Sequence, residues 1–109
     1  MNKKKAICKL LQIYHVGKEN AVHSKVLERK FGLNGRTIRR IISSLRQEGF
    51  PICSDESGYY FADTQQEINK TVSRLNELVT KISNARTGLL FSTPFEEANA
   101  IVEFTIKFI

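Results

Sequence analysis

Polar side chains that can contact an anionic ligand recur along residues 35–48 at a helical spacing. At about 100° per residue four of them fall on one face of a helix: Arg36, Arg40, Ser43 and Gln47. The opposite face is an apolar stripe formed by Ile38, Ile41, Ile42 and Leu45. Guanidinium groups bind phosphate oxygens and guanine edges, so this face suits a helix that contacts DNA. A surface helix without any ligand would show the same pattern. The neighbouring elements are therefore needed to decide between a DNA-contacting helix and an ordinary surface helix.

A second amphipathic helix is expected just before this one. It begins near His23 or Ser24, ends at Gly32, and is predicted to turn three residues to the core: Val26, Leu27 and Phe31. Asn34 then stands where its side chain can accept a hydrogen bond from a free amide, which makes it a candidate N-cap. Because only a short turn joins the two helices, they have to cross steeply, as in a helix-turn-helix.

Two further elements complete a small core. Apolar residues at helical spacing predict a first helix over about residues 3–16, which Gly17 can end. After the helix over 35–48, residues 50–54 and 59–62 are typical of two short strands joined by a tight turn at 55–58. Two strands of this length need further packing to be stable. We therefore expect them to form a β-wing on the three helices, contributing Ile52 and Tyr60 to the core.

A different pattern begins at Thr64. Apolar residues recur at heptad spacing over residues 64–89, with no proline or glycine before Gly88; they include Ile68, Val72, Leu75, Val79, Ile82 and Leu89. Such a stripe favours a long helix that pairs with a second chain, and packing on the N-terminal domain is the alternative. A helix of ~25 residues spans nearly 40 Å at 1.5 Å per residue, and a domain of ~60 residues, with a radius near 10 Å, can cover only part of it.

The last residues predict a short terminal helix. Thr93, Pro94 and Glu96 form a helix start with a capping residue, a proline at the first helical position and a capping box. The helix over about 94–108 ends in apolar residues, so it either folds against the long helix or docks on a second subunit. We therefore expect a DNA-binding domain over 1–62 and a helical association region over 63–109.

The charge of the chain is divided unequally between its halves. Residues 1–49 carry 12 lysines and arginines against three acids, a formal charge of +9, whereas residues 50–109 carry five against eight, a charge of −3. The whole chain of 109 residues has a net charge of +6. A basic half that also carries the helix over 35–48 indicates a polyanionic ligand.

The sequence offers little for catalysis, metal binding or membrane insertion. His15 and His23 are the only histidines, and no metalloprotease, nucleophile-elbow or phosphate-loop motif is present. We expect no enzyme, no cofactor and no metal site. Cys8 and Cys53 form no CxxC pair; reduced thiols are expected, with Cys8 half-buried on a helix, although a disulfide stays open. No run approaches the ~20 apolar residues that span a bilayer, which predicts a soluble, cytoplasmic protein.

The N-terminal half resembles the winged helix-turn-helix domains of bacterial transcription factors and is similar to those of the DeoR-like and biotin-repressor-like groups. The matching positions are Leu27, Phe31-Gly32-Leu33, Arg36-Thr37-Ile38-Arg39-Arg40, Ile42, Leu45 and Glu48-Gly49, with Pro51-Ile52-Cys53 and Gly58-Tyr59-Tyr60 similar to the wing. A long helix after this hairpin is also similar to small winged-helix proteins of phages and prophages. The resemblance covers about residues 6–62. It implies a mainly α fold with a small β-wing, followed by a long C-terminal helix and a short terminal helix.

In such domains the start of the third helix enters the major groove. The resemblance therefore implies that DNA is contacted by Asn34, Arg36, Thr37, Arg39, Arg40, Ser43 and Lys25. Arg36 and Arg40 suit bidentate contacts to guanine, whereas Arg39, on the flank of the face, suits a phosphate. Asp55 and Glu56 at the wing tip would repel phosphates, so we expect the wing to complete the core.

Two functions remain open from the sequence. The favoured one is a dimeric, sequence-specific regulator that binds double-stranded DNA, with its two recognition helices spaced by the C-terminal region. The other is a protein-interaction or assembly module, for example in a phage replication or packaging complex, in which the outward arginines meet an acidic partner. The basic half favours the first, and the acidic wing tip favours the second.

Overall fold

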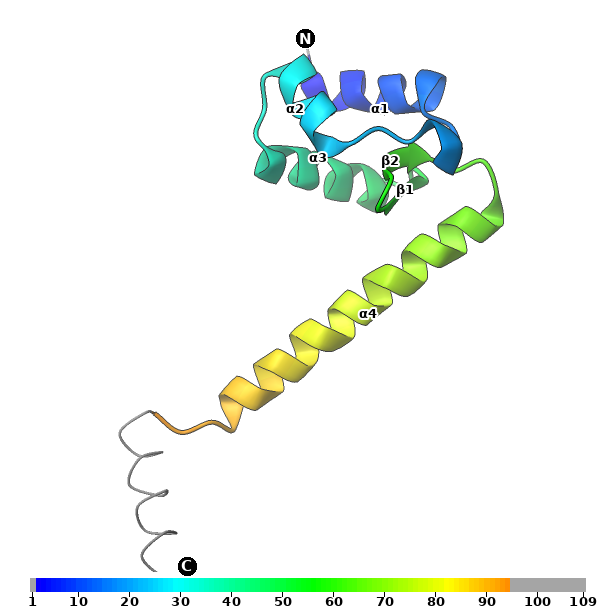
Figure 1. The fold of residues 1–109 in the computed structure, drawn as a ribbon. Coiled ribbons are helices and arrows are strands. Elements are labelled where there is room, and N and C mark those ends of the chain that lie inside the picture. The colour runs from blue at the N-terminus through cyan, green and yellow to red at the C-terminus, as the bar shows by residue number, and fades with distance from the viewer. Residues whose placement is uncertain (1, 95–109) are drawn as a thin grey trace, which may run out of the picture. The chain divides into compact units, whose positions relative to one another are not determined.

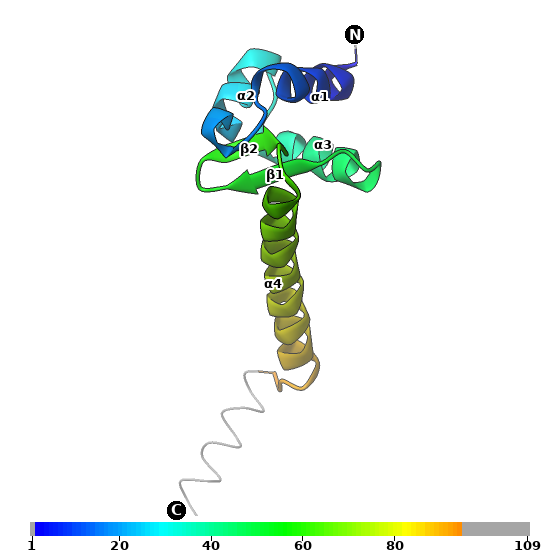
Figure 2. The same cartoon turned by 90° about the vertical axis from the view of Figure 1, so that its right-hand side faces the viewer.

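The computed structural model describes residues 2–94 of the chain and is mainly helical (Figures 1 and 2). In chain order its elements are α1 (Lys3–Tyr14), the 3-10 turn η1 (Lys18–Asn20), α2 (Ser24–Phe31), α3 (Gly35–Gln47), β1 (Ile52–Asp55), β2 (Gly58–Phe61) and α4 (Gln65–Leu90). The strands form one antiparallel hairpin. A mainly α fold with a small hairpin and a long helix is thereby confirmed, and the predicted helix over 94–108 lies outside the described residues.

The chain divides into two compact units, Met1–Leu75 and Asn76–Ile109. The first unit contains α1 to α3, the hairpin and the first turns of α4. Its core joins all three N-terminal helices to β1, through Ile7, Leu11, Leu27, Ile38, Ile42, Leu45 and Ile52. The apolar stripe predicted for the third helix is confirmed, with Ile41 partly buried against the same core.

One predicted core residue of α2 is wrong. Leu27 is fully buried and Phe31 packs against the core, but the side chain of Val26 is 49% exposed. Leu27 and Phe31 are four residues apart and share a face of the helix, whereas Val26 lies about 100° away from Leu27. A helix of eight residues has room for only one buried stripe, and Val26 falls outside it.

The connection between α2 and α3 has the geometry that its residues predict. Gly32 ends α2 in the left-handed conformation at φ 64°, which glycine adopts without steric cost. Two residues later, the Oδ1 of Asn34 accepts a hydrogen bond from the backbone N–H of Thr37 at 2.8 Å. The predicted N-cap is therefore confirmed, and the turn consists of only three residues between the helices.

The inner strand β2 is paired on both of its sides. Its register with β1 joins Cys53 to Tyr60 and Asp55 to Gly58. On its other side, the N–H and carbonyl groups of Tyr59 and Val22 exchange hydrogen bonds of 2.8 and 2.9 Å, and Val16 pairs with Phe61. The segment between α1 and α2 thus adds two β-bridges to the hairpin and connects it to the helices.

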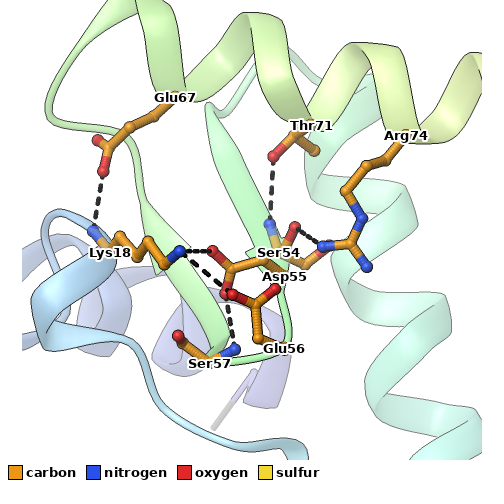
Figure 3. Close-up of polar contacts among 8 residues, drawn as sticks. All are labelled: Lys18, Ser54, Asp55, Glu56, Ser57, Glu67, Thr71 and Arg74. Atoms are coloured by element: carbon orange, nitrogen blue, oxygen red, sulfur yellow. Dashed lines mark hydrogen bonds and ion pairs between the residues drawn. The ribbon is translucent and has the colours of Figure 1, made fainter.

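The outer edge of β1 is occupied by side chains from α3 and α4. The carbonyl of Ile52 accepts a hydrogen bond from Arg46 Nε at 2.7 Å. The N–H of Ser54 donates to Thr71 Oγ1 at 3.4 Å, and the Ser54 carbonyl accepts from Arg74 Nη1 at 2.7 Å (Figure 3). Thr71 is buried in this contact. Side chains here take the positions that a third strand would occupy.

A capping box starts α4. The N–H of Glu67 donates to Thr64 Oγ1, and Glu67 Oε1 accepts from the N–H groups of Thr64 and Asp63, the latter at 2.7 Å. Its second oxygen, Oε2, accepts from the N–H of Lys18 at 2.9 Å (Figure 3). One carboxylate thus caps α4 and binds η1 to it.

Replacing Glu67 by Gln keeps one acceptor oxygen but removes the charge and the second acceptor. It is expected to lower the free energy of unfolding by about 1 kcal/mol at neutral pH, as for the loss of one hydrogen bond. The N–H of Asp63 first, then those of Lys18 and Thr64, hold the pKa of the carboxyl below its usual value. A lowered folded-state pKa gives stability that is present above the unfolded pKa of about 4.3 and lost as the pH falls through the folded value. The difference between the two proteins should therefore shrink in acid.

Urea unfolding at pH 7 and at about pH 3, spanning the carboxyl range, measures this difference. Glu77→Gln is the matched control, because it removes the same charge from an exposed position of α4. An equal effect of both substitutions at both pH values would contradict the capping role of Glu67.

Candidate nucleic-acid interface

The predicted DNA-contacting residues of α3 lie on its solvent side. Arg36, Arg39, Arg40 and Ser43 are exposed, as is the cap Asn34, while Thr37 is half-buried. The buried stripe fixes this orientation, because Ile38, Ile42 and Leu45 are each at most 2% exposed. Three guanidinium groups within two turns are therefore presented to solvent by a helix that is anchored in the core.

Lys25 lies apart from this set in sequence. It is exposed in the first turn of α2, on the other helix of the pair joined by the three-residue turn. Gln47, at the last position of α3, donates from Nε2 to Ser43 Oγ at 3.2 Å. The hydroxyl of Ser43 thus already has a partner on its own helix.

Arg46 differs from the other arginines of α3. Its Nε binds the carbonyl of Ile52 and its Nη2 binds Ser54 Oγ at 2.9 Å. Burial of this group lowers the pKa of the guanidinium, but an arginine stays charged at neutral pH. Arg46 therefore holds α3 to the hairpin, and the basic surface of α3 consists of Arg36, Arg39 and Arg40.

The exposed arginines of α3 have no acidic partner within 4.0 Å among residues 2–94. The ion pairs in that part of the chain join Lys4 to Glu48 and Lys18 to the hairpin tip. A guanidinium without a carboxylate partner keeps its full charge available for a ligand. This distinguishes the face from a surface whose charges are already compensated.

The acidic hairpin tip is neutralised in part by Lys18. Its Nζ lies 3.5 Å from Asp55 Oδ2 and 3.2 Å from Glu56 Oε1 (Figure 3). The hydrogen bond to Glu56, followed by the charges of Glu56 and Asp55, raises the pKa of Lys18. Asp55 also accepts from the N–H of Ser57 at 2.7 Å. The carboxylates of the tip are thus held by contacts with Lys18 and with the turn itself.

The histidines and cysteines have local roles. His15 Nδ1 lies 2.7 Å from the carbonyl oxygen of Asn20, a hydrogen bond within the connection that follows α1. Cys8 and Cys53 are both free and buried, so Cys8 is more deeply enclosed than the half-buried position predicted for it. In residues 2–94 no cluster of three potential metal ligands occurs, and no helix there is long and apolar enough to cross a membrane.

The predicted dimerisation residues of α4 fall into two groups. In the first unit, Ile68 is half-buried, and it lines a groove together with Val72 and Leu75. In the second unit, Val79, Ile82 and Leu89 are exposed by 63 to 75%. The groove is closed by residues of the α3–β1 connection, among them Phe50 and Pro51.

The sequence analysis missed several contacts of the first unit. One of them has a recognisable sequence pattern, and the others have none. The Thr64-x-x-Glu67 spacing is a capping box that the sequence displays, although it was not predicted. Arg46 and Arg74 bind a strand edge, and nothing local marks them for that role. In comparisons with known proteins, no family model, no curated protein and no solved structure matches this chain.

Proposed function

We propose that this chain is a winged helix-turn-helix protein that binds double-stranded DNA, with α3 as its recognition helix in the major groove. In this proposal α2 and α3 form the helix-turn-helix, and the β1–β2 hairpin is the wing. The protein acts as a dimer through its C-terminal helices and regulates transcription, as bacterial and phage proteins of this type do.

The observation that carries the proposal is the unpaired basic face of α3. Arg36, Arg39 and Arg40 are exposed and lack a carboxylate partner among residues 2–94. The helix that carries them is fixed by its cap at Asn34 and by its buried isoleucines. A helix fixed in this way supports contacts of its arginines to guanine edges and phosphates, because little backbone freedom is lost on binding.

The wing in this proposal stabilises the domain and does not enter the minor groove. Its tip carries two carboxylates that one lysine, Lys18, compensates only in part, and a minor-groove contact would require a cation there. The acidic tip was the argument for an assembly module that binds a protein. Since Lys18 neutralises part of that charge within the chain, we favour DNA.

Fluorescence anisotropy with a labelled random duplex tests the proposal directly. The full chain is expected to bind, and log Kd should rise linearly with log salt concentration, with a slope of about 0.9 per phosphate contacted. A single-stranded oligonucleotide of the same length serves as the comparison and is expected to bind more weakly. Absence of duplex binding at low salt would overturn the proposal and leave an acidic protein as the partner of α3.

A further inference from the structure

The apolar seam of α4 continues from a groove in the first unit to the end of the helix. Seam positions alternate in steps of four and three residues, which is the spacing of a two-helix coiled coil: Ile68, Val72, Leu75, Val79, Ile82, Arg86 and Leu89. Since α4 is one continuous helix of 26 residues, these positions share one face. Every position from Val72 to Leu89 in this series is apolar except Arg86.

The two ends of the seam differ in what they offer a partner. At its start, Val72 and Leu75 line a groove of about 280 Å³ that Phe50 and Pro51 close. At its other end are three consecutive apolar side chains, Leu89, Leu90 and Phe91, exposed by 75%, 61% and 85%. One end is a concave apolar surface, and the other is a set of bulky apolar side chains that could fill it.

We propose that two copies of this chain dimerise through α4 in antiparallel orientation, so that Leu89–Phe91 of each copy fills the groove beside Val72 and Leu75 of the other. The proposal rests on the dimer in the proposed function but not on DNA binding. In the heptad of this seam, Val72, Val79 and Arg86 are the a positions, and Leu75, Ile82 and Leu89 are d positions. An antiparallel coiled coil pairs each a position with a d position of the other helix. Leu89 then meets the partner's Val72, and Val79 meets the partner's Ile82, with the two-fold axis between Thr80 and Lys81.

Arg86 discriminates against the parallel orientation. In a parallel pair of identical helices each seam residue meets itself, so two Arg86 guanidinium groups would face each other inside an apolar seam. Like charges held together in a desolvated contact are unfavourable. In the antiparallel pair Arg86 meets the partner's Leu75, and its aliphatic stem can cover that side chain while the guanidinium reaches solvent.

The groove provides the second argument. A parallel pair would bring Leu89 against Leu89 and leave each groove beside Val72 without its complement. The antiparallel pair covers both exposed features of each chain with one contact, and it repeats that contact by symmetry. The flanking positions do not distinguish the orientations, because they are uncharged: Asn69, Thr71, Asn76, Leu78, Ser83, Ala85 and Leu90.

Cysteine cross-linking of the full chain tests the orientation. Val72→Cys and Leu89→Cys are oxidised separately and as an equimolar mixture, and covalent dimer is measured on a non-reducing gel. The antiparallel pair is expected to cross-link in the mixture alone, because its two copies of residue 89 lie about 25 Å apart at 1.5 Å per residue. Wild type is the control, since its two cysteines are buried.

Two results would overturn the proposal. Efficient cross-linking of Leu89→Cys alone indicates a parallel pair, and absence of cross-links in all samples indicates that α4 does not pair. Light scattering provides an independent measurement: Ile82→Lys is expected to give a monomer, whereas Asn84→Lys, which adds the same charge outside the seam, is expected to stay dimeric. Anisotropy on the same proteins separates a failure of dimerisation from a failure of DNA binding.

Discussion

Substituting Arg36 and Arg40 together by alanine is expected to weaken binding to random duplex DNA at least about tenfold. It should also lower the salt slope by about 2, because on DNA without a selected site each of these arginines contacts a phosphate. Both side chains are exposed and make no ion pair within residues 2–94. Their loss should therefore change the stability of the fold by less than about 0.5 kcal/mol. Fluorescence anisotropy at two salt concentrations, with thermal unfolding of both proteins, measures the two effects separately.

The matched control is Lys70→Ala together with Lys81→Ala. It removes the same two charges from exposed positions of α4 and is expected to change affinity by less than about threefold, because neither lysine belongs to the basic face of α3. If both double variants lose affinity equally, binding responds to net charge and α3 is not the recognition helix. On a selected binding site, each guanine contact should add about 1–3 kcal/mol of discrimination.

Substituting Gly58 by alanine is expected to lower the free energy of unfolding by roughly 3–5 kcal/mol, combining backbone strain with lost hydrogen bonds. Gly58 has φ 116°, and a Cβ there would lie 2.3 Å from the carbonyl oxygen of Val22. To relieve that clash Val22 has to move, which breaks its hydrogen bonds with Tyr59. Urea unfolding followed by circular dichroism measures the change.

Substitutions at two other glycines distinguish the effect of backbone strain from that of the steric clash with Val22. Gly49 has φ 95° but nothing within 4 Å of its Cβ position, so Gly49→Ala should cost only about 1–2 kcal/mol of strain. Gly88 lies in α4 in open space, and Gly88→Ala should favour the helix by up to about 1 kcal/mol. A loss at Gly58 no larger than that at Gly49 would contradict the close approach of Val22.

Local signals in the sequence predicted most of the first unit. Periodicity identified the buried face of α3, and Asn34 was recognisable as a cap because a cap is formed by neighbours in sequence. The hairpin was predicted from the same kind of evidence, with strand bounds within two residues. The exposure of the arginines of α3 could be predicted from its buried stripe, because burying one face of a helix leaves the opposite face in solvent.

Contacts between residues distant in sequence were not predictable in this way. Val22 pairs with Tyr59, and Arg74 binds Ser54. Nothing in the sequence next to Val22 or Arg74 marks either residue for its contact. Val26 was misplaced because a short helix with apolar neighbours permits more than one buried face. Whether α4 pairs with a second copy of the chain cannot be read from local patterns in one copy. The residue in the sequence that bears on the orientation of such a pair is Arg86.

The side chains along the outer edge of β1 have a consequence for the solubility of the protein. An uncovered strand edge is a template on which other chains add strands, and it promotes aggregation. Here Arg46, Thr71 and Arg74 occupy the free groups of Ile52 and Ser54, and Val16 and Val22 cover the opposite side of the sheet. Removing the first turns of α4 would thus free the N–H and carbonyl of Ser54 for pairing with another chain, while Arg46 of α3 would still occupy the carbonyl of Ile52.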